Sequence, residues 1–417
     1  MRQTLPYLKA FGLLIAAYLL FAVGSYLVPQ ASVERHVVKT IERGDLASDQ
    51  PRAFLPRLQC RMDNFTDALI LNQAYTLQAK GLIDGIMLVP RLSCGRLPFE
   101  ELRVAAGVDS AANNSTSIYA RYWHGNTFLA RYLLFFWDYP TIRLFLYIIS
   151  SLLMLWCGVL LWRRGGWQLP VAIGVGLLCS YVFVMQFSLQ LSMVLFIALG
   201  GMIVVAKRRS MPTTMVFFVI GSLTAFFDLL TAPILTLGLP LLVMLTLNPE
   251  EKLACSFRNV FFSSLLWLVG YGVTWVSKWA LATLFSPENI WEDGFRNLLN
   301  RSGVVDEYGR WDALMANLDL LPWAFVVIAL LIVVTLACRH FNKQGWSQAL
   351  PLLVVALIPW MWYLFAANHS YLHNWFTFRA QAVSIAAILL ALMKFVNWEI
   401  FYNKHNGKKD CCTSSVL

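Results

Sequence analysis

The chain has 417 residues, of which 58% are hydrophobic and only 13% are charged, and its mean hydropathy is +0.60. Soluble globular domains carry roughly 25% charged residues, so this composition excludes an ordinary soluble domain and predicts an all-α polytopic membrane protein. The net charge of +10 does not indicate nucleic-acid binding, because much of the basic charge lies in short connections between apolar runs and no nucleic-acid-binding motif is present.

Ten apolar runs are each long enough to cross, or nearly cross, about 30 Å of hydrocarbon, and they predict about ten transmembrane helices. In chain order the runs lie at 10–28, 142–162, 168–186, 189–206, 214–230, 233–247, 259–285, 321–338, 348–367 and 378–397. The first run is longer than the apolar part of a typical secretory signal, so we interpret it as an uncleaved anchor. The run at 233–247 is the weakest, since its length only just suffices.

The charges between these runs predict which side of the membrane each connection faces. Basic residues mark alternate connections, as at 163–164 and 207–209, whereas the connections near 187–189, 231–233 and 368–376 contain no Lys or Arg. By the positive-inside rule the basic connections and both termini are cytoplasmic. We therefore expect an integral membrane protein, located in a bacterial inner membrane.

This topology leaves two sizeable regions outside the cytoplasm. The expected organisation is a first transmembrane helix at 1–28, an extracytoplasmic loop module at 29–141, transmembrane helices 2–7 at 142–285, a second extracytoplasmic loop at 286–320, transmembrane helices 8–10 at 321–397 and a cytoplasmic tail at 398–417. Within the first loop, the stretches 66–89 and 127–137 are too short or too polar to span comfortably. We expect helices lying in the outer membrane interface there.

Cys60 and Cys94 are the cysteines of the first outer loop. An oxidising compartment would permit a disulfide between them, and two unassociated thiols are an equally good interpretation.

Ionisable residues near the outer ends of the spans form a candidate substrate site, because a bilayer penalises charge and such residues need an explanation. They are Arg121, His124, Arg143, Asp228, Lys278, His369, His373 and Arg379. Taken singly, each has a structural interpretation, such as a headgroup anchor, a helix cap or a snorkelling side chain. Taken together, their predicted convergence on one face favours a single site, in which basic residues neutralise a phosphate and histidines bind sugar or phosphate.

Asp63 and Asp67 are the candidate catalytic residues. Their i,i+4 spacing would place both carboxylates on one face of a helix, where repulsion and desolvation raise a pKa. Such a pair suits general-base catalysis or ligation of a divalent cation such as Mg²⁺ or Mn²⁺. An equally good interpretation is that the two residues are the acidic start of an ordinary helix. His369 and His373 have the same spacing, which on a helix could ligate zinc. Because no Cys or Glu ligand lies nearby in the sequence, we favour hydrogen bonding to substrate over a zinc site.

The layout resembles the GT-C class of integral membrane glycosyltransferases, which use polyprenyl-phosphate-linked sugars. The resemblance lies in the first span followed by a large outer loop, in the acidic motif at 61–68, and in the polar outer ends of later spans. It implies that Asp63, or else Asp67, acts as base toward the acceptor or helps to bind a metal. Asp63 lies farther from the first span than is usual in that class, which leaves Asp45 and Asp49 as substitutes.

The function that follows is transfer of a sugar from a lipid-phosphate donor to a glycan, lipid or protein acceptor on the extracytoplasmic face. No cofactor follows from the sequence with certainty; a divalent cation (Mg²⁺ or Mn²⁺) is the candidate, and membrane lipids are expected partners. The absence of phosphate-cradling and dinucleotide-binding motifs argues against a soluble nucleotide donor. The alternatives are an O-antigen ligase or polymerase, a transporter or flippase of a lipid-linked or polar substrate, and a purely structural role.

Overall fold

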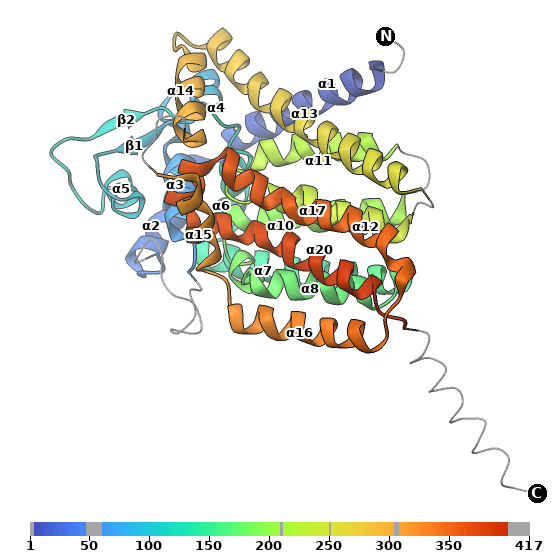
Figure 1. Cartoon of the computed structure of the whole chain (residues 1–417). Helices are drawn as coiled ribbons and strands as arrows, with labels where there is room; N and C mark the ends of the chain where they lie inside the picture. The colour runs from blue at the N-terminus through green and yellow to red at the C-terminus, as the bar shows by residue number, and fades with distance from the viewer. Residues whose placement is uncertain (1–3, 47–60, 209–211, 250–251, 304–307, 399–417) are drawn as a thin grey trace, which may run out of the picture.

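The computed structural model describes residues 4–46, 61–208, 212–249, 252–303 and 308–398. Its helices run side by side in a bundle, with a smaller layer of short elements across one end (Figure 1). The longer bundle helices are α1 (Leu5–Tyr26), α7 (Tyr139–Gly165), α10 (Leu189–Lys207), α13 (Leu253–Phe285), α16 (Trp323–Arg339) and α17 (Trp346–Phe365). The shorter bundle helices are α8 (Gln168–Cys179), α9 (Val182–Met185), α11 (Thr213–Phe227), α12 (Ile234–Leu247) and α20 (Gln381–Lys394).

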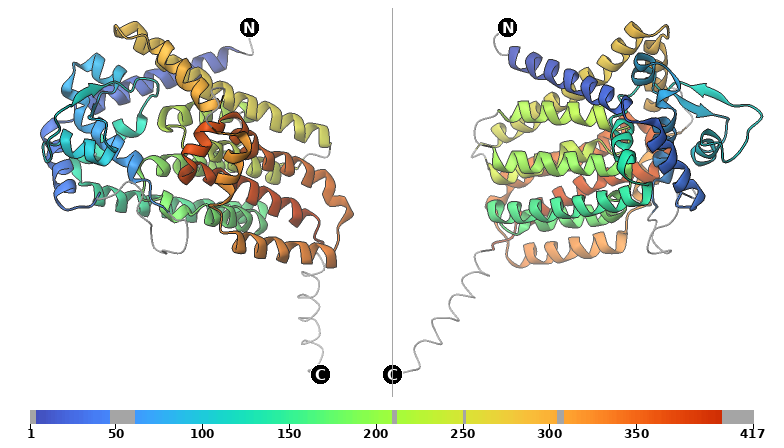
Figure 2. Two further views of the ribbon diagram at one scale, coloured as in Figure 1. Left: turned by 60° about the vertical axis from the view of Figure 1, so that its left-hand side comes forward. Right: turned by 180° about the vertical axis from the view of Figure 1, so that it is seen from behind.

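The elements at the end of the bundle form what we call the outer layer. From the first loop they are α2 (Gln30–Glu42), α3 (Asn64–Thr76), the 3₁₀ turn Leu77–Ala79, α4 (Leu82–Leu88), β1 (Arg91–Ser93), α5 (Pro98–Ala105), β2 (Ser115–Ser117) and α6 (Gly125–Phe136). From later in the chain they are α14 (Ile290–Ser302), α15 (Arg310–Leu318), α18 (Ala367–Leu372) and α19 (Asn374–Thr377). Further 3₁₀ turns cover Lys343–Gly345 and Phe378–Ala380. Figure 2 shows the outer layer at the same end of the bundle in both views, opposite the start of α1 and the end of α20.

The helices coincide with the apolar runs, but the expected count of ten spans is not confirmed. In the described part of the chain six helices are long and apolar enough to cross a membrane, or seven if α15 and α16, bent by 81° at their break, are counted as one span. Helices α8, α11 and α12 are apolar but only 12, 15 and 14 residues long. At about 1.5 Å per residue such helices cover roughly 18–23 Å, less than the hydrocarbon thickness.

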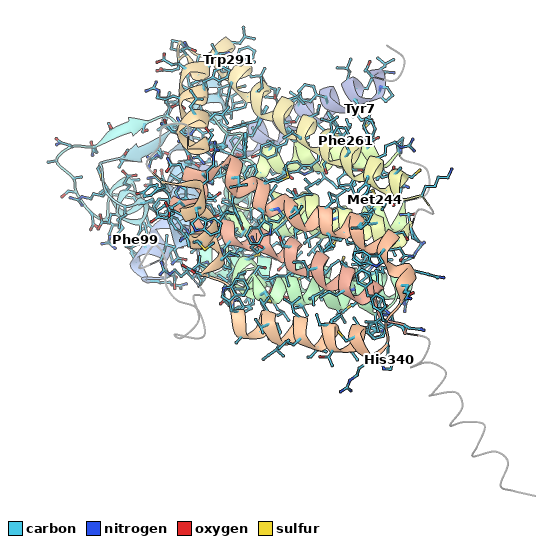
Figure 3. All side chains as sticks on the ribbon, in the orientation of Figure 1. Tyr7, Phe99, Met244, Phe261, Trp291 and His340 are labelled. Carbon is cyan, nitrogen blue, oxygen red and sulfur yellow. The ribbon has the colours of Figure 1, made fainter. Side chains whose placement is uncertain are left out.

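The centre of the bundle is formed by α10 and α20, whose most apolar stretches are 78% and 89% buried. The corresponding stretches of α1 and α7 are only 17% and 22% buried. Apolar side chains such as Phe261 therefore project from the peripheral helices away from the bundle, as expected for a surface in contact with lipid (Figure 3). This arrangement supports an integral membrane protein.

The expected interfacial stretches are helical, as α3 with α4 and as α6. Arg131, which interrupts the apolar run of α6, is fully buried. Its guanidinium donates to the carbonyl oxygens of Ser25 (3.0 Å) and Val28 (3.0 Å), as well as to Ala74 and Gln30. Arg131 thereby ties the end of α1 to α3 and α6, which explains a charge within an otherwise apolar helix.

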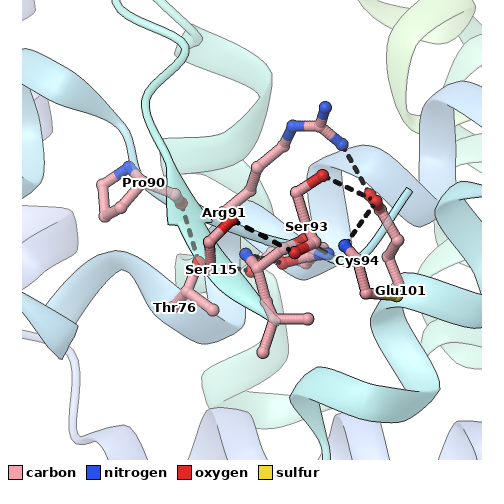
Figure 4. A network of polar contacts seen from close by, with 9 residues as sticks. Thr76, Pro90, Arg91, Ser93, Cys94, Glu101 and Ser115 are labelled. Carbon is pink, nitrogen blue, oxygen red and sulfur yellow. Dashed lines mark hydrogen bonds and ion pairs between the residues drawn. The ribbon is translucent and has the colours of Figure 1, made fainter. Parts of the chain in front are cut away.

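A second buried group organises the strand pair of the outer layer. Glu101 accepts hydrogen bonds from Arg91 (2.7 Å), the Ser93 hydroxyl (2.8 Å) and the Cys94 backbone N–H (3.0 Å), which joins α5 to β1 (Figure 4). Strands β1 and β2 pair antiparallel, with Ser93 opposite Ser115. Cys60 lies outside the described residues, so both interpretations, a Cys60–Cys94 disulfide and two unassociated thiols, stay open.

Candidate functional site

Asp67 and Asp228 lie at the N-terminus of α10, and both are buried, as is Asp63. Asp67 Oδ1 accepts from the Leu189 backbone N–H at 2.9 Å, and the next residue, Gln190, donates to Asp228 Oδ1 at 2.9 Å. Asp63 is the N-cap of α3, one turn before Asp67, and accepts from the Thr66 N–H at 3.0 Å. A helix N-terminus favours negative charge, which accounts for the position of Asp67.

The carboxylate of Asp67 is fully engaged by protein groups. Besides Leu189, it accepts from the Ser188 hydroxyl at 3.1 Å and the Tyr139 hydroxyl at 2.6 Å, and Arg143 lies 3.6 Å away. Burial raises the pKa of Asp67 to about 6, although the charge of Arg143 opposes the shift. These contacts make Asp67 a link between α3, α7 and α10.

Asp63 and Asp228 differ from Asp67, because each keeps one carboxylate oxygen, Oδ2, without a hydrogen-bond partner among the described residues. Burial raises the pKa of Asp63, opposed by its bonds to Thr66 and by the charge of Arg379. Buried polar atoms are rarely left unpaired in native structures. Each of these oxygens can accept a further hydrogen bond, and the Trp375 side chain also acts on Asp63.

Asp228 lies in the sharp turn between α11 and α12. Its Oδ1 also accepts from the Thr231 N–H at 2.9 Å, which closes the turn, and Leu230 has a left-handed backbone with φ of 70°. Such a conformation is costly for a branched residue and is often found at functional sites. It directs the Leu230 carbonyl toward α18, where it accepts from His369 Nε2 at 2.8 Å.

The histidine pair of α18 joins this turn to Arg301 of α14. Because the Leu230 carbonyl can only accept, His369 carries its proton on Nε2, and its Nδ1 accepts from Arg301 Nη1 at 2.9 Å. The imidazole centroids of His369 and His373 are 4.8 Å apart. Burial and then Arg301 lower the pKa of His373 to about 4, so it is neutral at pH 7. Its Nδ1 has no partner among the described residues.

Tyr122 faces the same cluster from the segment before α6, and the His124 ring lies beside it, with the two ring centroids 6.0 Å apart. The guanidinium of Arg301 lies 5.6 Å from the centre of the Tyr122 ring. Burial raises the pKa of Tyr122, and the charges of Arg301 and Asp228 act on the same phenol. The Tyr122 hydroxyl and His124 Nδ1 are both buried and without a partner in the described part of the chain.

His124 Nε2 donates to the Tyr119 carbonyl at 2.6 Å, and its backbone is left-handed with φ of 59°. Burial, and then the charge of Lys278, lower the pKa of His124 to about 3. The ring is therefore neutral, and its free Nδ1 can accept a hydrogen bond from a substrate hydroxyl.

The remaining basic candidates are held by protein contacts. Lys278 is fully buried, donates to the Ile86 carbonyl at 2.9 Å and lies 5.5 Å from the centre of the Trp123 ring. Arg121 pairs with Asp293 at 3.2 Å. Both lie on the side of the site near Tyr122 and His124.

Arg143 and Arg379 lie on the opposite side, near Asp67 and Asp63. Arg143 donates to the Asn64 side chain, and Arg379 donates to the Arg61 carbonyl at 3.3 Å. The predicted site residues thus lie where the bundle meets the outer layer, with one cluster around Asp63 and Asp67 and another in which Tyr122 lies near Arg301 and Asp228.

The expected cation site finds little support in the geometry. Among the described residues no group of three or more His, Cys, Asp or Glu side chains is placed to hold a metal ion. Asp63 and Asp67 would form only a pair, and both oxygens of Asp67 already accept hydrogen bonds. Hard divalent cations prefer six or more oxygen ligands, so water or substrate would have to complete the shell.

An apolar cavity of about 200 Å³ leads from the lipid-facing surface to Arg301, and we call it the α13–α17 groove. Its walls include Trp267 and Tyr271 of α13, and its outer end is formed by Leu230 and Arg301. Side chains at its mouth such as Phe365 are 60% exposed, as expected for contact with lipid. The groove therefore runs from an exposed apolar surface to Arg301 and to Leu230, two residues after Asp228.

Sequence reasoning missed Arg301 and Gln190. Arg301 stands in the loop 286–320 among several charged residues, and its local sequence does not distinguish it from Arg296 or Arg310. Gln190 is uncharged within an apolar run. The one signal in the sequence that could have identified these residues is the position of a polar residue beside the predicted outer end of a helix.

Comparison of the chain with protein-family models, with curated proteins and with solved structures gives no match.

Proposed function

We propose that the protein is a membrane glycosyltransferase of the GT-C kind, which moves a sugar from a polyprenyl-phosphate donor to a hydroxyl of an acceptor. The observation that carries the proposal is the α13–α17 groove, an apolar cavity lined by Arg301 and by Leu230, two residues after the buried carboxylate Asp228, whose Oδ2 has no partner among the described residues. An apolar tail, an anionic phosphate and an acceptor hydroxyl each have a matching surface in this arrangement.

Arg301 is the residue best placed to hold the donor phosphate. A guanidinium suits phosphate because it offers several N–H donors in one plane. The Arg301 guanidinium donates to the neutral His369 and lies near the Tyr122 ring. Among the described residues no carboxylate is in direct contact with this guanidinium. Its positive charge is therefore available to a phosphate.

Asp228 and Asp63 are the candidate bases, and Asp228 is the one whose charge acts on the same Tyr122 phenol as that of Arg301. In the proposed step the carboxylate takes the proton of the acceptor hydroxyl, and the oxygen attacks the anomeric carbon. The bond from that carbon to the phosphate oxygen breaks, and the lipid phosphate leaves with the electron pair, its charge neutralised by Arg301. Asp67 is a positioning residue, because its oxygens are already bonded.

The reaction face is the extracytoplasmic one, since the outer layer lies opposite the bundle end that holds the basic connections. A bacterial inner membrane is the location that suits a polyprenyl-phosphate donor.

The test uses the purified chain in lipid nanodiscs with a panel of radiolabelled undecaprenyl-phosphate sugars. We expect Asp228→Asn to lower kcat at least about 100-fold, as for loss of a general base. Arg301→Gln should raise the donor KM more than about 10-fold. Arg296→Gln is the matched control, since Arg296 is on the same helix and its side chain is 64% exposed.

The opposite outcomes are equally clear. Full activity of both Asp228→Asn and Asp63→Asn would remove the carboxylate from the mechanism. If the wild-type chain moves the lipid-linked sugar across proteoliposomes but forms no new glycosidic bond, the protein is a flippase.

A further inference from the structure

A polar cavity of about 260 Å³ lies at the end of the bundle opposite the outer layer, and we call it the inner cavity. Its walls come from the end of α7, the start of α8, the end of α12, the connection between α16 and α17, and the end of α20, which meet at this end in Figure 1. Its polar lining residues are a lysine, a threonine and four amides: Lys394, Thr246, Gln168, Asn342, Gln344 and Gln348.

Backbone contacts fix the shape of the inner cavity. Phe341 and Val396 form an isolated β-bridge, and the Asn342 N–H donates to the Phe395 carbonyl at 2.7 Å. The Asn342 side chain also donates to the Lys394 carbonyl at 3.3 Å. These contacts hold the connection between α16 and α17 against the end of α20, so the inner cavity is a built part of the fold.

Two groups of the inner cavity lack an acceptor. Thr246 Oγ1 is buried and has no hydrogen-bond partner among the described residues. Lys394 is partly buried and takes part in none of the ion pairs that the described residues form. Every Asp and Glu that the structure describes lies in or beside the outer layer, at the other end of the bundle. A hydroxyl and an ammonium removed from water without a carboxylate call for an anionic ligand.

The surroundings of the inner cavity are also positively charged. Arg163 and Arg164 end α7 directly before Gly165, which lines the cavity. Lys343 stands between two lining residues of the connection between α16 and α17, and all three of these basic side chains are exposed. Basic pockets between membrane helices on the cytoplasmic side attract anionic lipid headgroups.

Tryptophans place the inner cavity at the level of the lipid headgroups. Trp398 lines the cavity, and its ring packs edge-on against Trp167 with the centroids 4.9 Å apart. Trp346, directly after the lining residue Gly345, is 54% exposed. Tryptophan at the ends of membrane helices lies at the headgroup level. Drug-sized ligands occupy pockets of roughly 300–1,000 Å³, so the smaller inner cavity suits a headgroup better than a nucleotide.

From these observations we propose that the inner cavity binds the phosphate of an anionic phospholipid. Lys394 and the Thr246 hydroxyl donate to the phosphate oxygens, and the amides of Gln344 and Gln348 suit the hydroxyls of a glycerol headgroup. This site goes beyond the proposed function, and its test does not depend on sugar transfer.

Two variants separate a ligand site from a structural role. Lys394→Met removes the charge and keeps the length of the side chain. Thr246→Val replaces the hydroxyl by a methyl group, and it removes no hydrogen bond to the described protein, because Thr246 Oγ1 has no partner there. Lys252→Met is the matched control, since Lys252 is exposed at the start of α13, at the same end of the bundle, and does not line the cavity.

The experiment titrates the full chain, freed of lipid in detergent, with phosphatidylglycerol, phosphatidylcholine or inorganic phosphate. Native mass spectrometry gives the Kd of the bound lipid, and thermal unfolding gives the shift of the midpoint. We expect phosphatidylglycerol to bind several-fold more tightly than phosphatidylcholine. Lys394→Met and Thr246→Val should each weaken phosphatidylglycerol binding at least about 10-fold, as for loss of a hydrogen bond to a charged group. Lys252→Met should bind as the wild-type chain does.

Equal affinity for phosphatidylglycerol and phosphatidylcholine, or unchanged binding in both variants, would overturn the proposal. An equal midpoint shift with inorganic phosphate alone would assign the cavity to a soluble phosphate compound instead of a lipid. Glu399 lies outside the described residues, so Glu399→Gln tests a competing partner. If Lys394→Met destabilises the lipid-free wild-type chain but not the Glu399→Gln variant, Lys394 pairs with that carboxylate and the proposal fails.

Discussion

Asp67 shows how one carboxylate can have two interpretations in a sequence and a single one in a structure. Its position one helical turn after Asp63 suggests catalysis and an acidic helix start equally well. The hydroxyls of Tyr139 and Ser188 and the backbone N–H of Leu189 occupy its oxygens. Asp63 and Asp228, each with a free Oδ2, are left as the carboxylates that can act on a substrate.

Asp67 also predicts a pH dependence of stability. Its pKa is raised from 3.8 to about 6, so its contribution to folding is fully present below pH 3.8 and is lost as the pH rises through about 6. A shift of this size corresponds to at most about 3 kcal/mol. We expect the thermal unfolding midpoint in detergent to fall between pH 4 and pH 6.5, and to fall less in Asp67→Asn.

Asp109→Asn is the control for that measurement. Asp109 is exposed, and its hydrogen bonds with Arg103 lower its pKa, so its contribution is lost only in more acidic solution. The same slope in Asp67→Asn as in the wild-type chain would show that Asp67 does not titrate in this range.

At the scale of helices, α11 and α13 approach each other closely through a pair of glycines. A Cβ at Gly221 would lie 2.0 Å from the Trp267 carbonyl oxygen, and one at Gly270 would lie 2.1 Å from that of Phe218. Small residues allow such contact between membrane helices, where packing replaces the hydrophobic effect. This contact holds the base of the Asp228 turn, since α11 ends at Phe227.

We therefore expect Gly221→Ala to destabilise the protein by about 1–3 kcal/mol, because the methyl group would force the two helices apart. Gly158→Ala, where a Cβ meets nothing within 4 Å, should be neutral or stabilise by up to about 1 kcal/mol. Thermal unfolding in detergent measures both. If the two variants unfold at the same temperature, the close approach is not what the packing of α11 requires.

The helices were the part of the fold that could be predicted. Apolar runs depend on local composition, so each predicted span has a helix within it. Span number was less predictable, because α8 ends at Cys179, before Tyr181 adopts a left-handed backbone with φ of 54°. Such a break depends on packing, and an unbroken apolar run at 168–186 does not reveal it.

At the scale of the whole molecule, the outer layer and the basic connections lie at opposite ends of the bundle. Ser115 of β2 is exposed in the outer layer, and Lys343 is exposed between α16 and α17. In a chain whose eight native cysteines are replaced, we expect a membrane-impermeant maleimide to label Ser115→Cys in intact cells. Lys343→Cys should react only after the cells are opened.

The reverse pattern would place the proposed reaction on the cytoplasmic side. Labelling of both positions in intact cells would mean that the bundle between them does not span the membrane.

The sequence by itself determined that most of this protein lies in a lipid bilayer. It also determined where the apolar helices lie along the chain and that a polar layer is separate from them, because hydropathy and charge are local properties. The tertiary structure decided which charged residues share a site. His369 bonds to Leu230, 139 residues away, and to Arg301, 68 residues away. Contacts at such separations follow from how helices pack, and neither the role of Arg301 nor the α13–α17 groove could be identified before that packing was known.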